Sequence, residues 1–138
     1  MSMLLKIVTP ESTFFSGEVE GAVVPGIVGQ LGLLPNHAPM VTTMEPGELT
    51  YTHNGEEHTI AVGEGFIEVT QDHVSILTDL AVTHQDIDLA AEEDAIARAK
   101  RALESADHTP EEVAAVRAAL SKSLVKVGLK RRIGNGGI

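Results

Sequence analysis

The chain has 138 residues, a length that suits one domain, or one domain with a small appendage. It carries 20 acidic and 10 basic residues, and this net charge of −10 argues against a nucleic-acid-binding protein, which needs a cationic surface. Cysteine is absent, so disulfides, thiolate metal sites and cysteine nucleophiles are excluded.

The first part of the chain, up to about residue 83, alternates short β-favouring runs with turn signals, the pattern of a sandwich or barrel. Aromatic residues make up only 3% of the chain, so we expect an aliphatic core. The stretch from Gly21 to Met44 has no charge at neutral pH, but its prolines and glycines would break a membrane-spanning helix. We therefore expect a soluble protein without direct membrane insertion. The first strands are predicted at Leu4–Thr9, Gly17–Val24 and Pro39–Thr43.

Two β-hairpins are predicted next. Asn54-Gly55 readily adopts the positive φ angles of a type I′ turn. In the second hairpin, Ile67 and Val69 share one face of their strand, whereas Phe66 and the polar residues beside it share the other. The paired runs are residues 49–53 with 59–62 and residues 65–69 with 74–77.

From Asp88 onward apolar residues recur at helical spacing, and residues 87–138 contain 11 alanines. Asp88 is expected to cap the first helix, and Thr109–Glu112 forms a capping box with proline at the first position of a second helix. The apolar stripe of the first helix comprises Leu89, Ile96, Ala99, Leu103 and Ala106. The stripe of the second comprises Val113, Val116, Leu120, Leu124 and Val127.

The loop at Asp107-His108 is short, so the two helices should form an antiparallel hairpin. Gly128 should weaken the end of the second helix, and Gly134–Gly137 should fray. The alanine-rich stripes bury little, so the hairpin should need a partner, either the β part or another protein. The predicted fold is thus an all-β sandwich over residues 1–86, with a net charge of −11, followed by a C-terminal two-helix hairpin over residues 87–138, with +1.

The sequence shows no catalytic constellation. His53 and His58 flank the Asn-Gly turn and could approach each other, but the HxH pattern of β-barrel metal sites is missing, so we interpret them as exposed strand-end residues. His37 lies in a turn, where a histidine usually bonds to the backbone. The glycines at Gly26–Gly32 lack both the P-loop ending and the dinucleotide spacing, so we interpret them as turn glycines. No metal, cofactor or enzymatic activity is predicted.

The second predicted helix is rich in cations. Such a run is either a solvated face or a docking face for an acidic partner, and the residues alone leave both readings open. The cations are Arg117, Lys122, Lys126, Lys130, Arg131 and Arg132.

The segment Gly26–Pro39 reads GIVGQLGLLPNHAP. It resembles the signature loop of the ε subunit of F-type ATP synthases, which commonly reads G-x-x-G-x-L-G-x-L-P-x-H-A-P. The opening residues 4–26, and the runs 67–69 and 74–77, are similar to the same family in order and spacing. The resemblance covers essentially the whole chain.

This resemblance implies a non-catalytic rotor subunit of the central stalk, which couples the γ subunit to the c ring for proton-driven ATP synthesis. The sandwich would bind γ and sit on the ring of c subunits, with Gln30 and His37 of the signature loop facing the ring. The subunit would lie at the cytoplasmic face of the cell membrane as a peripheral protein.

The hairpin, by the same resemblance, folds against the sandwich or extends along γ into the α/β catalytic head and blocks ATP hydrolysis. Its basic second helix would then meet an acidic stretch on the β subunits. The docking residues would be Arg117, Lys122, Lys126 and Lys130.

Some members of the family bind ATP in the hairpin through a motif of the form I/L-D-x-x-R-A. Here Ile87–Ala90 is followed by Ala91 and Glu92, so both the arginine and the alanine are missing, although Arg98 or Arg101 could substitute. Two other classes stay open: a free β-sandwich protein-binding module with a dimerising helical hairpin, and a small metal-dependent β-barrel enzyme.

Overall fold

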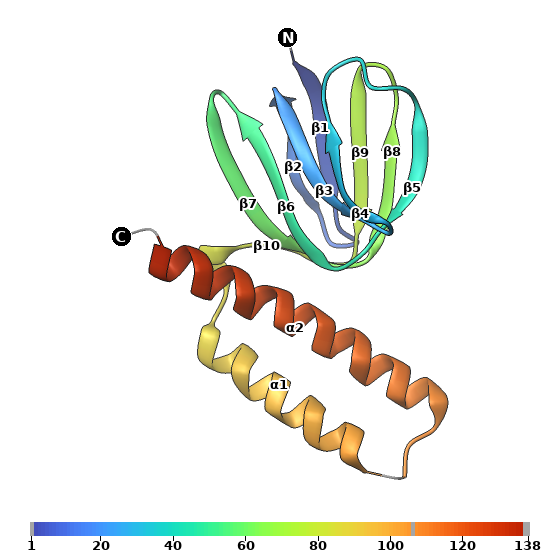
Figure 1. Cartoon of the computed structure of the whole chain (residues 1–138), viewed down its shortest axis with the longest axis vertical. Coiled ribbons are helices and arrows are strands. Elements are labelled where there is room, and N and C mark those ends of the chain that lie inside the picture. The colour runs from blue at the N-terminus through green and yellow to red at the C-terminus, as the bar shows by residue number, and fades with distance from the viewer. Residues whose placement is uncertain (1, 106, 137–138) are drawn as a thin grey trace. The chain divides into compact units, whose positions relative to one another are not determined.

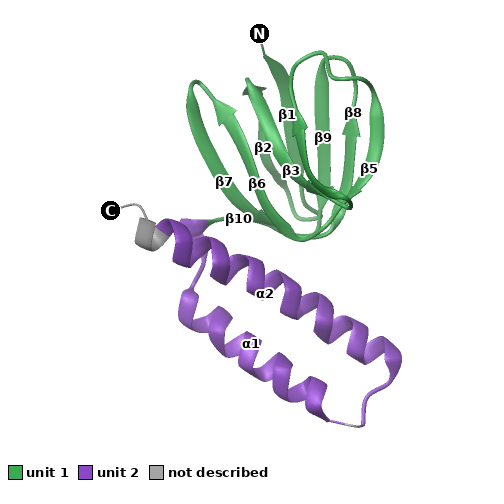
Figure 2. Cartoon of the chain, viewed as in Figure 1, with its two compact units in different colours: residues 1–83 green, residues 84–138 purple. Residues whose placement is uncertain are grey.

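The computed structural model describes residues 2–105 and 107–136, the last three in their backbone only. The chain divides between Thr83 and His84 into two compact units (Figure 2). The second unit begins three residues before the predicted boundary because the 3₁₀ helix η1 (His84–Asp86) contacts the second helix, where Lys130 Nζ donates to the carbonyl oxygen of His84 at 2.9 Å.

Unit 1 is all-β, as predicted, and Figure 1 shows its strands wrapped into a barrel-like sandwich. The strands follow one hydrogen-bonded order, β10-β7-β6-β3-β5-β8-β9-β1-β2, and β4 pairs with β3. They are β1 (Met3–Val8), β2 (Thr13–Val19), β3 (Gly21–Gly26), β4 (Gly29–Leu33), β5 (Met40–Met44), β6 (Gly47–His53), β7 (Glu56–Val62), β8 (Gly65–Val69), β9 (His73–Thr78) and β10 (Ala81–Thr83).

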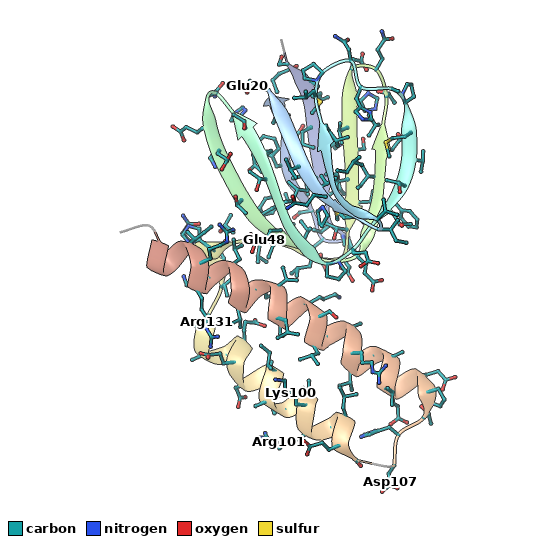
Figure 3. The ribbon with its side chains drawn as sticks, in the orientation of Figure 1. Glu20, Glu48, Lys100, Arg101, Asp107 and Arg131 are labelled. Atoms are coloured by element: carbon teal, nitrogen blue, oxygen red, sulfur yellow. The ribbon has the colours of Figure 1, made fainter. Side chains whose placement is uncertain are left out.

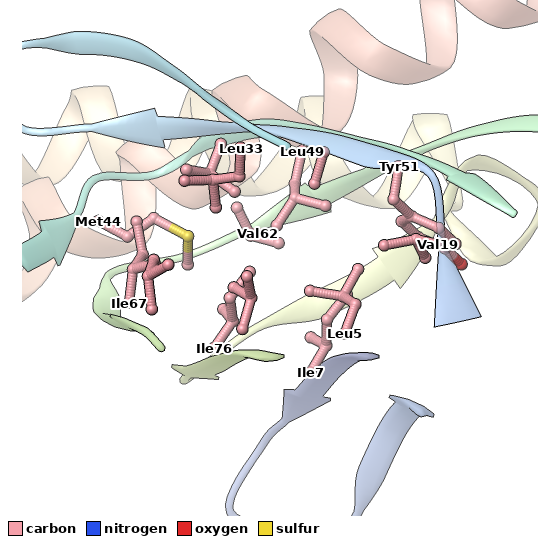
Figure 4. Close-up of a cluster of buried hydrophobic side chains, with 14 of the residues drawn as sticks. Leu5, Ile7, Val19, Leu33, Met44, Leu49, Tyr51, Val62, Ile67 and Ile76 are labelled. Atoms are coloured by element: carbon pink, nitrogen blue, oxygen red, sulfur yellow. The ribbon is translucent and has the colours of Figure 1, made fainter. Parts of the chain in front are cut away.

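The inner faces of this folded sheet enclose one aliphatic core (Figure 4). Leu5 and Ile7 from β1 and Ile76 from β9 face Leu33 from β4 and Leu49 from β6, and all five side chains are fully buried. Burial of aliphatic side chains is the dominant favourable term in folding, so this cluster is what holds the two layers together.

Three features of unit 1 differ from the prediction. The expected strand Gly17–Val24 is two strands, because the chain bends at Glu20, whose backbone N–H donates to Thr52 O at 2.8 Å. The strands β4 and β10 were not predicted. Two glycines weaken the local strand signal of β4, which is supported by its pairing with β3 along the whole of its length.

Both predicted hairpins are confirmed. Asn54 and Gly55 have φ angles of 54° and 77°, the positive values that a type I′ turn requires. In β8, Ile67 and Val69 are buried and Phe66 is exposed, as the alternation predicted.

Unit 2 contains α1 (Leu89–Glu104) and α2 (Pro110–Gly136), which pack against each other (Figure 1). Both predicted caps are confirmed: Ala91 N donates to Asp88 Oδ1 at 3.1 Å, and Glu112 N donates to Thr109 Oγ1 at 3.2 Å. Glu93, near the start of α1, pairs with Arg131, near the end of α2, so the hairpin is antiparallel, as predicted.

The second helix differs from the prediction in its length and in its buried face. It continues through Gly128 to Gly136. Leu124 of the predicted stripe is exposed, whereas Ser123 and Leu129 are buried. Two residues of the predicted elements, Ala106 and Gly137, lie outside the described residues.

Candidate partner-binding site

The signature segment forms a tight hairpin between β3 and β4. Gly26 pairs with Gly29 across a two-residue turn, Ile27-Val28. Gly29 has a φ of 120°, a conformation that side chains with a Cβ rarely adopt, so glycine is required there. Val28 is 98% exposed and Ile27 is 59% exposed, so the tip of this hairpin offers an apolar surface to solvent.

Gln30 lies in β4 and not in the turn where we expected it. Its Cα partner in β3 is Pro25. Leu31 and Leu33 of β4 turn toward the core, so the alternation of the strand directs the exposed Gln30 side chain outward. Its amide is therefore accessible to a partner on a backbone that the sheet holds.

His37 closes a turn that begins at Leu34, since the His37 N–H donates to Leu34 O at 3.2 Å. Pro35 and Asn36 are its central residues, and Asn36 has a φ of 65°, the combination typical of a type II turn. The ring bonds to the backbone, as expected: His37 Nδ1 lies 2.8 Å from Ala38 O. A carbonyl oxygen only accepts, so the hydrogen is on Nδ1 and Nε2 is left for a partner.

A larger apolar surface, which the sequence reasoning missed, lies on the outer face of the strands β5, β8, β9 and β1. Phe66 is directly opposite Leu77, which in turn pairs with Val8 in parallel. Phe66 is 58% exposed and Leu77 is 53% exposed, and Val41 of β5 is also exposed. We call Val8, Val41, Phe66 and Leu77 the outer apolar strip. The alternation of residues 65–69 already placed Phe66 on the face opposite to Ile67 and Val69, so the exposure of Phe66 could have been predicted from the sequence.

A shallow pocket of about 390 Å³ lies along this strip. The residues that line it include Val8, Pro10, Gly65, Phe66 and Leu77. Exposed apolar patches with a hollow of this kind mark sites of protein–protein contact more often than plain surface.

The two histidines beside the Asn-Gly turn do not pair with each other. His53 faces Glu56 across the hairpin, and His58 faces Tyr51, on which its ring stacks at 5.2 Å. His53 Nδ1 donates to Glu18 O at 2.5 Å. Burial raises the pKa of Tyr51 above its ordinary value.

Among the described residues, no group of three or more His, Asp or Glu side chains could hold a metal ion.

Several cations of α2 have partners within the chain. Lys126 Nζ lies 3.4 Å from Glu92 Oε2, Arg131 pairs with Glu93, and Lys122 also interacts within the chain. Arg117 is exposed. The predicted docking residues are thus not one uniform solvated face. Glu92, which stands where the ATP motif would place its alanine, is the acceptor for Lys126.

Comparison with known proteins decides the family. Residues 2–84 match the family described as ATP synthase, Delta/Epsilon chain, beta-sandwich domain. The chain is 36% identical over 132 residues to ATP synthase epsilon chain 2 of Syntrophotalea carbinolica, covering 96% of both chains. It is 40% identical over 126 residues to the ATP synthase epsilon chain of Anaeromyxobacter sp. strain Fw109-5, covering 88% of this chain and 96% of that one. This chain belongs to the ATP synthase epsilon family.

Solved structures share the epsilon fold. A chain of the Euglena gracilis mitochondrial ATP synthase, solved as OSCP/F1/c-ring, superposes with a TM-score of 0.73 at 21% identity, covering 87% of this chain and 76% of that one. A chain of the Tetrahymena thermophila central stalk and c-ring structure superposes with a TM-score of 0.65 at 11% identity, covering 94% and 97%.

The epsilon chain is a non-catalytic subunit of the central stalk, so the predictions of the family, of the fold class and of a non-enzyme are confirmed. As an ATP synthase subunit it is part of a membrane-associated complex. No helix in residues 2–105 or 107–136 is long and apolar enough to cross a membrane. The epsilon matches at full length favour this reading over the free binding module and the metal-dependent enzyme.

Proposed function

We propose that this epsilon chain joins the γ subunit to the c ring of a bacterial F-type ATP synthase at the cytoplasmic face of the cell membrane. In this role unit 1 transmits the rotation between γ and the ring during proton-driven ATP synthesis. Unit 2 restrains ATP hydrolysis by the α/β head.

The outer apolar strip is the observation that carries the proposal for γ. A permanent contact between subunits needs a large, apolar and well-packed centre. Phe66 stands at the middle of the strip, paired across strands with Leu77. Aromatic anchors beside a pocket are the residues that dominate protein interfaces.

Capture of purified γ by the full chain tests this contact. The change Phe66→Asp places a charge at the centre of the strip and should weaken γ binding at least tenfold, because an unpaired charge in an interface costs more than about 1.4 kcal/mol. Val23→Asp is the matched control, because Val23 is also an exposed apolar strand residue but lies outside the strip. Equal binding by the two variants would remove the strip from the γ interface.

For the c ring we propose the β3–β4 hairpin and the turn that follows it. Gln30 offers a neutral amide and His37 offers Nε2, so both would contact the ring through hydrogen bonds. The exposed tip Ile27-Val28 adds an apolar contact beside them. All four side chains are carried by backbone that strand pairing or a closed turn holds in place.

We propose that α2 contacts an acidic stretch of the α/β head through four cations, Arg117, Lys122, Lys126 and Lys130. Opposite charges across an interface raise the association rate and select the partner. We expect no ATP sensing in the hairpin, because the motif lacks its arginine and Glu92 adds a negative charge beside Lys126.

A further inference from the structure

Glu92 holds the two helices together at the open end of the hairpin. Its Oε1 accepts from Ser123 Oγ at 2.9 Å, and its Oε2 lies 3.4 Å from Lys126 Nζ. The side chains of Glu92 and Lys126 are only 20% and 21% exposed, and Ser123 is buried. One carboxylate of α1 thus binds two donors from successive turns of α2.

Two further contacts lie beside this one. Arg131 pairs with Glu93, and Lys130 donates to the carbonyl of His84. Arg131 lies between α2 and the first turn of α1 in Figure 3. Ser123, Lys126 and Lys130 are spaced by three and four positions, so they share one face of α2, and Arg131 follows directly after Lys130. We call Glu92, Glu93, Ser123, Lys126 and Arg131 the interhelix clasp.

The clasp is distinct from the other charge pairs in unit 2. Asp94 pairs with Arg98 one turn later in the same helix, and His108, which precedes α2, pairs with Glu112 in the first turn of α2. Neither of these pairs joins α1 to α2, and both are more exposed than the pair of Glu92 and Lys126. A charged hydrogen bond that is largely shielded from water contributes more, and losing one partner leaves the other without its bond.

We propose that Glu92 and Glu93 serve as the chain's own acidic partner for the cations of α2, so that the clasp keeps the hairpin closed and withholds Lys126 from other subunits. Lys126 has one ammonium group, and a Glu92 carboxylate beside it competes with any acidic surface elsewhere. An external partner shifts this equilibrium only by the difference in its affinity for the open and closed hairpins. The second half of the proposal, the competition with another subunit, rests on the proposed restraint of hydrolysis.

The full chain has no cysteine, so two introduced cysteines can carry spin labels without background. Ala90→Cys on α1 and Gly128→Cys on α2 place one label on each helix close to the clasp; both positions are exposed, and a Cβ at Gly128 meets nothing within 4 Å. The distance distribution between these labels reports opening. Glu92→Ala should raise the open population about tenfold, the factor expected from one shielded charged hydrogen bond.

Asp94→Asn is the matched control, because it removes a carboxylate from the same helix without touching α2. It should leave the distance distribution as in the unchanged chain. The proposal is overturned if Glu92→Ala keeps the distance distribution of the unchanged chain, or if Asp94→Asn opens the hairpin as much as Glu92→Ala does.

Exchanging the charges of residues 92 and 126 tests whether their attraction, and not the loss of helix, controls the opening of the hairpin. Lys126→Glu alone should open the hairpin, and Glu92→Lys combined with Lys126→Glu should close it again, with circular dichroism recording the helix content throughout. Opening that the exchange does not reverse, with or without a loss of helix, overturns the proposal.

The rate of ATP hydrolysis by the assembled enzyme tests the competition for Lys126 and distinguishes its failure from failure of the proposed restraint. With Glu92→Ala the freed Lys126 should strengthen inhibition and lower the hydrolysis rate. If deletion of unit 2 raises the hydrolysis rate but Glu92→Ala leaves it unchanged, Glu92 does not compete with another subunit for Lys126. If the deletion also changes nothing, the proposed restraint fails, and the label distances alone decide the clasp.

Discussion

Gly65 lies against the backbone of Leu77 so closely that a Cβ on Gly65 would stand 1.9 Å from the Leu77 carbonyl oxygen. No side chain fits in this space, and the neighbour is backbone, which cannot rotate away. The close approach lets β8 and β9 pair from Gly65 onward and sets Phe66 opposite Leu77 in the outer apolar strip.

We therefore expect Gly65→Ala to destabilise unit 1 by about 3 kcal/mol, the upper range for overpacking a native structure. Gly32→Ala is the control, because a Cβ there meets nothing within 4 Å. Urea unfolding followed by the fluorescence of Tyr51, the single tyrosine, measures the difference in unit 1. Equal midpoints for the two variants would contradict the close approach.

The ring-facing proposal predicts that Gln30→Ala with His37→Ala impairs proton-driven ATP synthesis without unfolding the chain. Gln30 is exposed on β4 and the His37 ring uses only Nδ1 internally, so neither change removes a core contact. Synthesis rates in membrane vesicles carrying the assembled complex measure the effect, and the urea midpoint checks the fold. Normal synthesis by the double variant would remove both residues from the coupling contact.

Deleting residues 84–138, the second compact unit, should raise ATP hydrolysis by the assembled enzyme and leave assembly intact. Arg117→Glu should raise hydrolysis by a smaller factor, because a single exposed charge acts mainly on association and is screened by salt. Lys100→Glu on α1 is the control for a change of the same charge. If neither the deletion nor Arg117→Glu alters hydrolysis at low salt, unit 2 is not a restraint.

The cap of α2 predicts a dependence on pH. Hydrogen bonds from His108 and then from Thr109 lower the pKa of the Glu112 carboxyl below its ordinary value of 4.5. A lowered pKa in the folded state means that the carboxylate stabilises the fold above pH 4.5 and that this contribution is lost as the pH falls below it.

Glu112→Gln should therefore lower the thermal midpoint of the hairpin at pH 7, and the difference from the unchanged chain should shrink toward pH 3. Glu111→Gln, one position earlier in the same helical turn, is the control for the loss of charge. Circular dichroism at both pH values provides the measurement. A difference that stays constant with pH would show that the carboxylate does not act through its ionised form.

The elements that the sequence predicted well are those with local causes. The turn at Asn54-Gly55 follows from residues that tolerate positive φ, and the starts of both helices follow from the caps Asp88 and Thr109. The prediction of His37 bonded to the backbone has the same origin, because its acceptor is the next residue along the chain. The family was recognisable from the loop motif together with the order and spacing of the opening residues and two later runs.

Only the tertiary structure shows the features that depend on contacts between residues far apart in the sequence. The strand β4 carries two glycines and is a strand because β3 pairs with it, so the sequence alone placed Gln30 in a turn. Lys126 and Glu92 are 34 positions apart, and no local pattern shows that a cation on one helix is already bound to a carboxylate on the other. Periodicity identifies which faces of an element are apolar, but only packing determines which polar groups those faces bring within bonding distance.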